Sequence, residues 1–288
     1  MPAGTKFTTT VGDTQYTYVT NSDKTITPQD SVYTFSNVKI YEGTRITFQY
    51  TADSNSEDQR FIVPNSNADL TTLKVEVQNS SSDTRSFTYS KATSLTGAAS
   101  DTRVYFTQEV EDGKFEVYFG DGAVGKKIQD GNIVKLTYIV TNKTLSNGAN
   151  SFSLSGTIAG FSAQTITVNS KSAGGAEPES IASVKINAPL QYSSQDRAVT
   201  VADYKTLVKQ IYPAANAIQV WGGEDNSTPQ YGKVFISVKL ADGSNLTSVD
   251  KTDIETQLGQ YAAVSYTHLR AHETPEHRVC RLMLEKKK

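Results

Sequence analysis

The chain has 288 residues, 37% of them hydrophobic and 20% charged, with a formal net charge of −2 at pH 7. This length can bury a substantial core without disulfide bonds, and the near-neutral charge gives no general attraction to nucleic acid. Because no apolar run approaches the ~18 residues of a membrane-spanning helix, we expect a globular protein with neither a nucleic-acid partner nor a membrane span.

The first 170 residues show the pattern of short β-strands separated by turns. β-Branched and aromatic residues gather in several short runs, which are 15–20, 44–50, 60–64, 73–78 and 103–110. Turn pairs such as Gly12-Asp13 and Asp112-Gly113 separate them, and such pairs suit β-hairpins. We therefore expect a mostly β region over residues 1–170, built of antiparallel sheets or a sandwich in one or two subdomains and connected mainly by hairpins.

The clearest strand pattern lies at residues 115–119. Phe115, Val117 and Phe119 alternate with Glu116 and Tyr118. A period of two puts the first three side chains on one face of a strand, which is typical of a half-buried strand. We expect this apolar face to belong to the core.

A glycine-rich stretch follows that strand and matches two nucleotide-binding motifs, G-x-G-x-x-G and G-x-x-x-x-G-K. Gly120, Gly122 and Gly125 carry the first match, and Gly120, Gly125 and Lys126 carry the second. Both motifs need a helix directly after the glycines, since its free amides bind the phosphates. Here a strand-like run at 133–140 follows, and Lys127 stands where a phosphate-binding loop has Ser or Thr. The stretch therefore predicts a loop between strands at 114–119 and 133–140, with no bound nucleotide or other cofactor.

From residue 171 the pattern changes to mixed helix and strand. Pro178 suits the first turn of a helix that carries Ile181 and Val184. Two strand-like runs occur later, "AIQVWGG" at 217–223 and "GKVFISVKLADG" at 232–243. We expect an incomplete α+β domain over residues 171–263.

A second helix, at 201–212, has the strongest helical signals. Thr200 is a good N-cap residue, and Asp203 at the third helical position favours the positive helix end. One apolar stripe has the spacing i, i+3, i+4, i+7 and consists of Tyr204, Leu207, Val208 and Ile211. Ser248 is expected to cap a last helix that bears Ile254 and Leu258, and the next strand should start near residues 262–264.

The last segment, 264–288, differs in composition from the rest. All three histidines, the only cysteine and one of the two methionines lie in it. His272, His277 and Cys280 offer three zinc-type ligands, but Pro275 interrupts a single helix and no second cluster completes a tetrahedral site. The segment resembles translated sequencing-adapter read-through, so we expect a non-native or disordered tail.

Catalytic chemistry finds little support in the remaining chain. Residues 1–263 contain no histidine and no cysteine, which removes Ser-His-Asp and Cys-His systems and His/Cys metal sites from this part. Carboxylates such as Asp112 and Asp130 stand in predicted turns, where aspartate is common. Asp196 and Arg197 could form a functional charge pair, but their place just before the Thr200 cap favours a structural role. We expect no catalytic, cofactor-binding or metal-binding residue.

Two stretches carry a resemblance to a known family. They are "YFGDGAVGKKIQDGNIVKLTYIVTN" at 118–142 and "GGAEPESIASVKINAPLQYSSQDRAVTVADYKTLV" at 174–208. Their order resembles the baseplate wedge proteins of contractile-tailed, T-even-like bacteriophages and their baseplate J-like relatives, over about residues 2–263. The resemblance implies structural roles in the first stretch for Gly120, Asp121, Gly122 and Gly125. In the second stretch it implies a helix ending in "NAP" and structural roles for Gly174, Gly175, Asn187, Pro189, Asp196, Arg197, Asp203 and Tyr204.

The resemblance implies a structural role in the virion. Such a protein forms protein–protein interfaces in the tail baseplate ring after synthesis in the host cytoplasm. Its partners would be other baseplate wedge proteins and further copies of itself, and no enzymatic activity, cofactor or small-molecule substrate is expected. An alternative is a β-sandwich module of a tail protein that binds carbohydrate or a cell surface, although the α+β segment argues against it.

Overall fold

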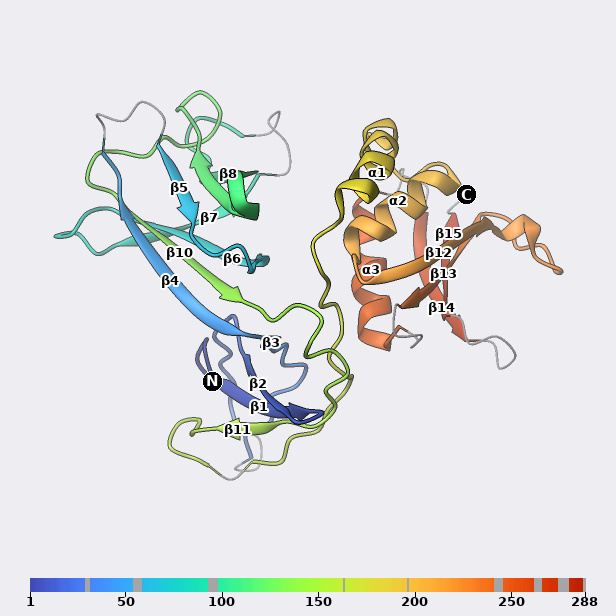
Figure 1. Cartoon of the computed structure of the whole chain (residues 1–288), viewed down its shortest axis with the longest axis horizontal. Coiled ribbons are helices and arrows are strands. Elements are labelled where there is room, and N and C mark those ends of the chain that lie inside the picture. The colour runs from blue at the N-terminus through green and yellow to red at the C-terminus, as the bar shows by residue number, and fades with distance from the viewer. Residues whose placement is uncertain are drawn as a thin grey trace. The chain divides into compact units, whose positions relative to one another are not determined.

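The computed structural model describes residues 1–28, 32–53, 59–92, 98–162, 164–195, 197–240, 246–261, 266–273 and 280–286. The chain divides into two compact units, Met1–Thr167 and Val168–Lys288 (Figure 1). The sequence placed this division between residues 170 and 171. The first unit is mostly β and the second combines helices with a sheet, as the sequence predicted.

The first unit begins with a small antiparallel sheet in the order β11-β1-β2-β3. Its strands are β1 (Lys6–Val11), β2 (Thr14–Val19), β3 (Tyr41–Glu42) and β11 (Ser153–Ser155). Gly12, with φ +59°, makes the predicted turn between β1 and β2. Phe7, Tyr18 and Ala149 form its core, in which the Tyr18 ring meets the edge of Phe152 at 4.9 Å.

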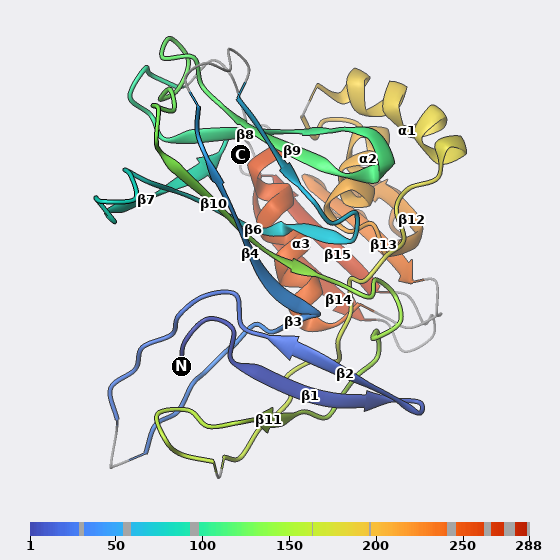
Figure 2. The ribbon, with the colours of Figure 1, turned by 60° about the vertical axis from the view of Figure 1, so that its left-hand side comes forward.

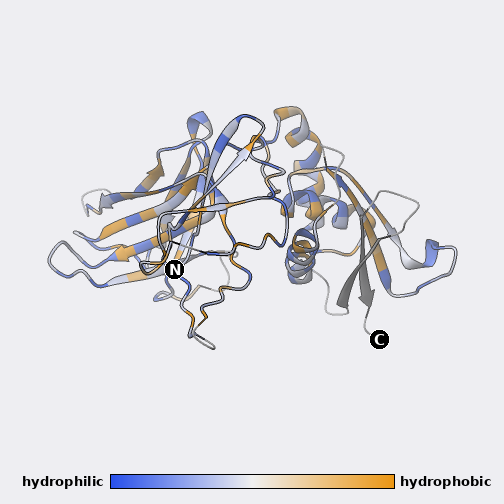
Figure 3. Ribbon diagram, turned by 90° about the horizontal axis from the view of Figure 1, so that it is seen from below, coloured by the Kyte–Doolittle hydropathy of each residue, from blue (hydrophilic) through white to orange (hydrophobic). Residues whose placement is uncertain are grey.

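A larger sheet of seven strands has the order β4-β10-β6-β7-β8-β9-β5. Its strands are β4 (Thr44–Thr51), β5 (Arg60–Val63), β6 (Ala68–Gln78), β7 (Ser86–Lys91), β8 (Val104–Glu109), β9 (Phe115–Phe119) and β10 (Ile133–Val140). A short 3₁₀ helix, Glu111–Gly113, joins β8 to β9. Hydrophobic and hydrophilic residues alternate along the strands (Figure 3), which reflects the period of two.

Two pairings differ from the predicted hairpins. β5 does not pair with β6, its neighbour in the sequence; it pairs with β9, with Val63 opposite Phe115. β7 and β8 run parallel rather than antiparallel. A short connection, residues 64–67, separates β5 from β6, and a longer one, residues 92–103, separates β7 from β8. Neighbouring positions in the sequence therefore did not predict the pairing partner of β5 or the direction of β8.

The larger sheet curls until its two edge strands meet. The Tyr50 hydroxyl on β4 donates to the Ile62 carbonyl on β5 at 2.6 Å, and the Tyr50 ring lies 5.6 Å from the Phe61 ring. Strands from all parts of the sheet share one core, whose fully buried residues include Val63, Val117 and Leu136. The contact at Tyr50 thus joins the two edge strands through side chains, without backbone pairing between them.

β9 is covered on both faces, whereas the sequence indicated a half-buried strand. Val117 is fully buried, while Phe115 and Phe119 are half-buried. On the opposite face Glu116 is also buried, and the Arg60 guanidinium on β5 binds its carboxylate. This ion pair was not predicted, because it depends on the pairing of β9 with β5, which was not predicted either.

The second unit holds an antiparallel sheet in the order β12-β13-β15-β14. Its elements are α1 (Ile181–Ser194), α2 (Val201–Ile211), β12 (Ala215–Gly222), a 3₁₀ helix (Gly223–Asp225), β13 (Lys233–Leu240), α3 (Ser248–Tyr261), β14 (Tyr266–Glu273) and β15 (Cys280–Lys286). The predicted strand start at residues 262–264 lies outside the described residues. β14 and β15 fall where the sequence indicated a non-native or disordered tail, and the foreign origin of that segment stays a prediction.

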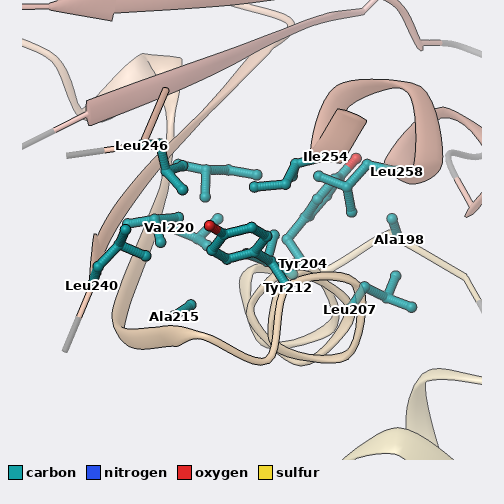
Figure 4. Close-up of a cluster of buried hydrophobic side chains, with 13 residues drawn as sticks. Ala198, Tyr204, Leu207, Tyr212, Ala215, Val220, Leu240, Leu246, Ile254 and Leu258 are labelled. Atoms are coloured by element: carbon teal, nitrogen blue, oxygen red, sulfur yellow. The ribbon is translucent and has the colours of Figure 1, made fainter. Parts of the chain in front are cut away.

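The core of the second unit confirms the predicted stripe on α2. The side chains on this stripe are buried: at most 1% of Tyr204, Leu207 or Val208 is exposed, and Ile211 packs beside them. They meet Ile236 and Val238 of β13. Figure 4 shows Ile254 and Leu258 of α3 in the same cluster. The stripe thus ties α2 to the sheet and to α3.

The helix termini differ in part from the predictions. α1 begins at Ile181 behind the Ser180 cap rather than at Pro178. It also continues through Pro189 to Ser194 instead of ending at "NAP". A proline removes one backbone hydrogen bond and bends a helix, but it does not have to end it.

The cap of α3 is Thr247 rather than the predicted Ser248. The Thr247 hydroxyl accepts from the Asp250 amide at 3.2 Å, and the Asp250 carboxylate accepts from the Thr247 amide at 3.1 Å. This reciprocal pair is a capping box, which the sequence T-S-V-D contains one residue before the position we chose.

Candidate interaction surface

The glycine-rich stretch forms a compact loop held by its own backbone. A Cβ on Gly120 would lie 2.1 Å from the Val124 carbonyl oxygen, and Gly125 has φ +79°, so both positions favour glycine. The Asp121 carboxylate accepts from the Ala123 amide at 2.8 Å and the Val124 amide at 3.0 Å. Both hydrogen bonds lower the pKa of Asp121, and the bond from the Val124 amide has the larger effect.

The same loop is fastened to the chain before β8. The Lys126 amide donates to the Thr102 carbonyl at 2.9 Å, and the Gly122 amide donates to the Gly125 carbonyl at 3.1 Å. β10 follows without an intervening helix, which confirms the predicted strand, loop and strand. The loop uses its amides internally, so its glycines serve the turn geometry.

Of the family-motif residues in the second unit, Asp203 and Tyr204 lie on α2. The Asp203 carboxylate accepts from the Thr200 amide at 2.8 Å, and the Asp203 amide donates to the Thr200 hydroxyl at 3.2 Å. This capping box confirms the predicted N-terminus of the helix. Arg197 donates to the Gln195 side chain at 3.0 Å, and Asp196 lies outside the described residues.

Asn187 belongs to a small hydrogen-bond network on α1. Its side-chain amide donates to Glu179 and, at 3.0 Å, to the Ser183 hydroxyl, which itself donates to Glu179. The Ser183 hydroxyl and the Asn187 amide hold the pKa of Glu179 below its ordinary value. Gly174, with φ +92°, and Gly175 lie in the extended segment before this network.

α1 turns its polar side toward its own unit. It packs against α2, and Figure 2 shows it beside α2 at the margin of the unit. Its least exposed residues are Ser183 and Asn187, which are half-buried, and Ser194, which is buried. These three residues are four and seven apart and therefore lie on one face of the helix.

The other side of α1 presents apolar residues to solvent. Ile181, Val184, Ala188 and Tyr192 are spaced by three, four and four residues, so they form one stripe along the helix. Tyr192 is 84% exposed, Ile181 76% and Val184 43%. We call these four residues the α1 stripe. Two further apolar side chains of the helix, Ile186 and Leu190, are also exposed.

The arrangement is the reverse of the usual surface helix, whose apolar face meets the core. Single exposed apolar residues are ordinary, whereas a continuous apolar patch marks a binding surface. The sequence of 181–192 places apolar residues on more than one side of the helix, because Ile186 and Leu190 lie away from the α1 stripe. It does not show which face the unit covers, and for that reason the α1 stripe was missed.

Chemical sites are few in the part of the chain that the structure describes. Among these residues no group of three or more His, Cys, Asp or Glu side chains lies close enough together to hold a metal ion. His277, one of the three residues weighed as zinc ligands, lies outside the described ranges. None of the described helices is long and apolar enough to cross a membrane.

Comparisons with known proteins place two segments of the chain. Residues 44–150 match the family described as "Bacteriophage baseplate wedge protein gp6, third domain", and residues 200–268 match "Baseplate structural protein gp6, C-terminal domain I". The baseplate wedge protein gp6 of Enterobacteria phage T4 is 25% identical over 287 residues, which cover 91% of this chain and 42% of that relative. The chain thus spans less than half the length of the relative.

The two matches correspond to recognisable parts of the fold. The first holds the whole curled sheet from β4 to β10, and the second begins at the Thr200 cap of α2. The second match also extends past residue 263 to residue 268. Neither match includes α1. The read-through resemblance and the tail boundary near residue 264 stay predictions.

Proposed function

We propose that this chain is a structural component of a phage tail baseplate wedge and works by forming protein–protein interfaces in the baseplate ring. The observation that carries the proposal is the pair of matches, a third domain followed along the chain by C-terminal domain I of the same wedge protein. The similarity to the T4 wedge protein runs across both units of the chain and supports it.

Sequence and structure support a role in binding rather than in catalysis. Residues 1–263 have no histidine or cysteine, and amides of the glycine loop donate to backbone carbonyls of the chain. The α1 stripe offers an exposed apolar surface of the kind that a subunit interface covers. We therefore infer a non-enzymatic function without a cofactor or a small-molecule substrate.

The partners in this proposal are other baseplate wedge proteins and further copies of the chain. The protein would be made in the host cytoplasm and incorporated into the tail baseplate of the virion. A baseplate J-like relationship is part of the same proposal and rests on the resemblance of residues 118–142 and 174–208.

The experiment that tests the proposal is co-expression of the tagged chain with the proteins encoded beside its gene. We expect a baseplate protein to co-purify at a fixed stoichiometry and to co-sediment with the chain in velocity ultracentrifugation. A glycan array serves as the comparison. Saturable glycan binding by a chain that leaves its encoded neighbours behind would contradict the proposal and support a carbohydrate-binding module.

A further inference from the structure

We propose that the Asn147-Gly148 pair is a site of spontaneous deamidation, and that its conversion to isoaspartate loosens the small sheet β11-β1-β2-β3. The inference goes beyond the proposed function, because it concerns a covalent change of the chain that needs only water. Three observations carry it: the residue order of the pair, the exposed amide of Gly148, and the anchored residues on either side.

The residue order is the first observation. Asn147-Gly148 is the only Asn-Gly pair in the sequence. Deamidation begins when the backbone nitrogen of the following residue attacks the asparagine side chain, and glycine hinders this attack least because it has no Cβ. The pair lies in the turn 143–148, between β10 and β11. This turn therefore has the residue order that favours the reaction most.

The surroundings of Gly148 leave its nitrogen open to reaction. The residue is exposed, its φ is +91°, and a Cβ built on it would meet no atom within 4 Å. Its amide makes no hydrogen bond within the part of the chain that the structure describes. The turn is held through a neighbour, because the Asn147 amide donates to the Thr144 carbonyl at 3.1 Å. The attack therefore breaks no hydrogen bond of the nucleophile.

The Asn79-Ser80 pair shows the opposite arrangement. The Asn79 side-chain amide donates to the Asp83 carboxylate at 2.8 Å, and the Ser80 backbone amide donates to the Asp83 carbonyl at 3.1 Å. Both reacting groups are therefore held, and both hydrogen bonds have to break before the Ser80 nitrogen can attack. Asn79 serves as an internal control within the same chain.

Water is the only co-reactant that the change needs. The Gly148 nitrogen forms a bond to the side-chain carbonyl carbon of Asn147, the bond from this carbon to the side-chain nitrogen breaks, and ammonia leaves with the proton of the Gly148 amide. Water then opens the cyclic imide at either carbonyl, which gives aspartate or isoaspartate. Either product adds one negative charge to a chain whose formal net charge is −2.

The structural consequence follows from the residues that flank the pair. The Ser146 carbonyl accepts a buried hydrogen bond from the Tyr18 hydroxyl on β2 at 2.9 Å, and Ala149 lies in the core of the small sheet. An isoaspartate lengthens the backbone by one carbon between these two anchored residues. Because protein interiors are closely packed, the longer connection weakens the hydrogen bond of Tyr18 or the packing of Ala149.

The test compares deamidation in the full chain with that in synthetic peptides of residues 142–152 and 75–84. All samples are kept in the same mildly alkaline buffer, digested under acidic conditions and analysed by mass spectrometry with fragmentation. We expect Asn147 to react within about tenfold of its peptide rate, because a surface turn opens at little cost in free energy. Asn79 should be slowed more than about tenfold relative to its own peptide, since its hydrogen bonds have to break first.

Asn147→Gln is the matched variant, because the longer side chain keeps the amide but closes the ring much less readily. Labelling by an isoaspartate methyltransferase should detect isoaspartate at residue 147 in the aged parent chain and not in the aged variant. Hydrogen exchange of the aged samples should then be faster in β1 and β2 of the parent chain than of the variant. Exchange in α2, which belongs to the other unit, should be the same in both.

Two results would overturn the inference. One is an Asn147 side chain that stays unmodified after its peptide has been converted. The other is unchanged hydrogen exchange in β1 and β2 once isoaspartate has formed. Circular dichroism before ageing verifies that the variant folds. Both results are separate from the wedge proposal, which co-purification decides.

Discussion

α1 and α2 are neighbouring helices of one unit, and both carry an apolar stripe. α2 buries Tyr204, Leu207 and Val208 against the sheet and α3. α1 presents Ile181 and Tyr192 to solvent and turns serine and asparagine toward α2. An apolar stripe therefore predicts that other residues cover it, while the position of the helix in its unit decides whether those residues belong to the same unit.

The largest expected effect is the loss of the α2 stripe from the core. Leu207 is fully buried, so Leu207→Ala should lower the free energy of unfolding by about 2–5 kcal/mol, the usual range for such a cavity. The matched control is Lys205→Ala on the exposed side of the same helix, which should cost almost nothing. Urea denaturation of both variants measures the difference. Equal stability of the two variants would show that the stripe does not hold the core.

A smaller loss is expected at the start of α2. Thr200→Ala removes the hydroxyl that accepts from the Asp203 amide, and the free energy of unfolding should fall by about 1 kcal/mol. Thr200→Ser keeps an accepting hydroxyl and should retain most of the stability. If serine and alanine destabilise the protein to the same degree, the capping box contributes nothing.

The exposed stripe should behave in the opposite way to the buried one. Tyr192→Ser removes a large aromatic side chain that is 84% exposed, so the free energy of unfolding of the isolated chain should stay within about 0.5 kcal/mol. Tyr204→Ser, at a position that is 1% exposed, should be strongly destabilising. Thermal melts measure both variants. A similar loss of stability in both would contradict the assignment of Tyr192 to the surface and Tyr204 to the core.

The smallest effect concerns the polar face of α1. Because the folded pKa of Glu179 lies below its ordinary value of 4.5, the stabilisation is present above about pH 4.5 and is lost as the pH falls through the folded pKa. Asn187→Ala removes one of the two donors and should raise the pKa of Glu179 toward its ordinary value. An NMR titration of the Glu179 carboxyl group measures the shift, and an unchanged pKa would show that Asn187 does not take part.

The elements of the fold followed from local patterns more readily than their partners did. The α2 stripe and the strands β9 and β10 were predictable, because the spacing of apolar residues reports directly on helix and strand. The pairing of β5 with β9 was not, because β5 pairs with a strand distant in the sequence although only residues 64–67 separate it from β6. Glu116 was missed for the same reason, because its ion pair with Arg60 exists only through that pairing.

The candidate surface was predictable only in part. A helix that carries Ile181 and Val184 was predicted, but the family resemblance implied that it ends in "NAP", which left out Tyr192, the most exposed residue of the stripe. A single sequence gives the two faces of a helix without saying which one is inside. The contact between α1 and α2, which decides that question, depends on the packing of the complete unit.

The most direct test of the central claim pairs unfolding with co-purification for Tyr192→Asp and Leu207→Ala in the chain co-expressed with its encoded baseplate neighbours. We predict that Tyr192→Asp no longer co-purifies with a baseplate neighbour that covers the α1 stripe, while its melting temperature stays unchanged. Leu207→Ala should lower the melting temperature by several degrees. Retention of all partners by Tyr192→Asp, or loss of partners by Leu207→Ala at unchanged stability, would contradict the assignment of the exposed stripe as interface and the buried stripe as core.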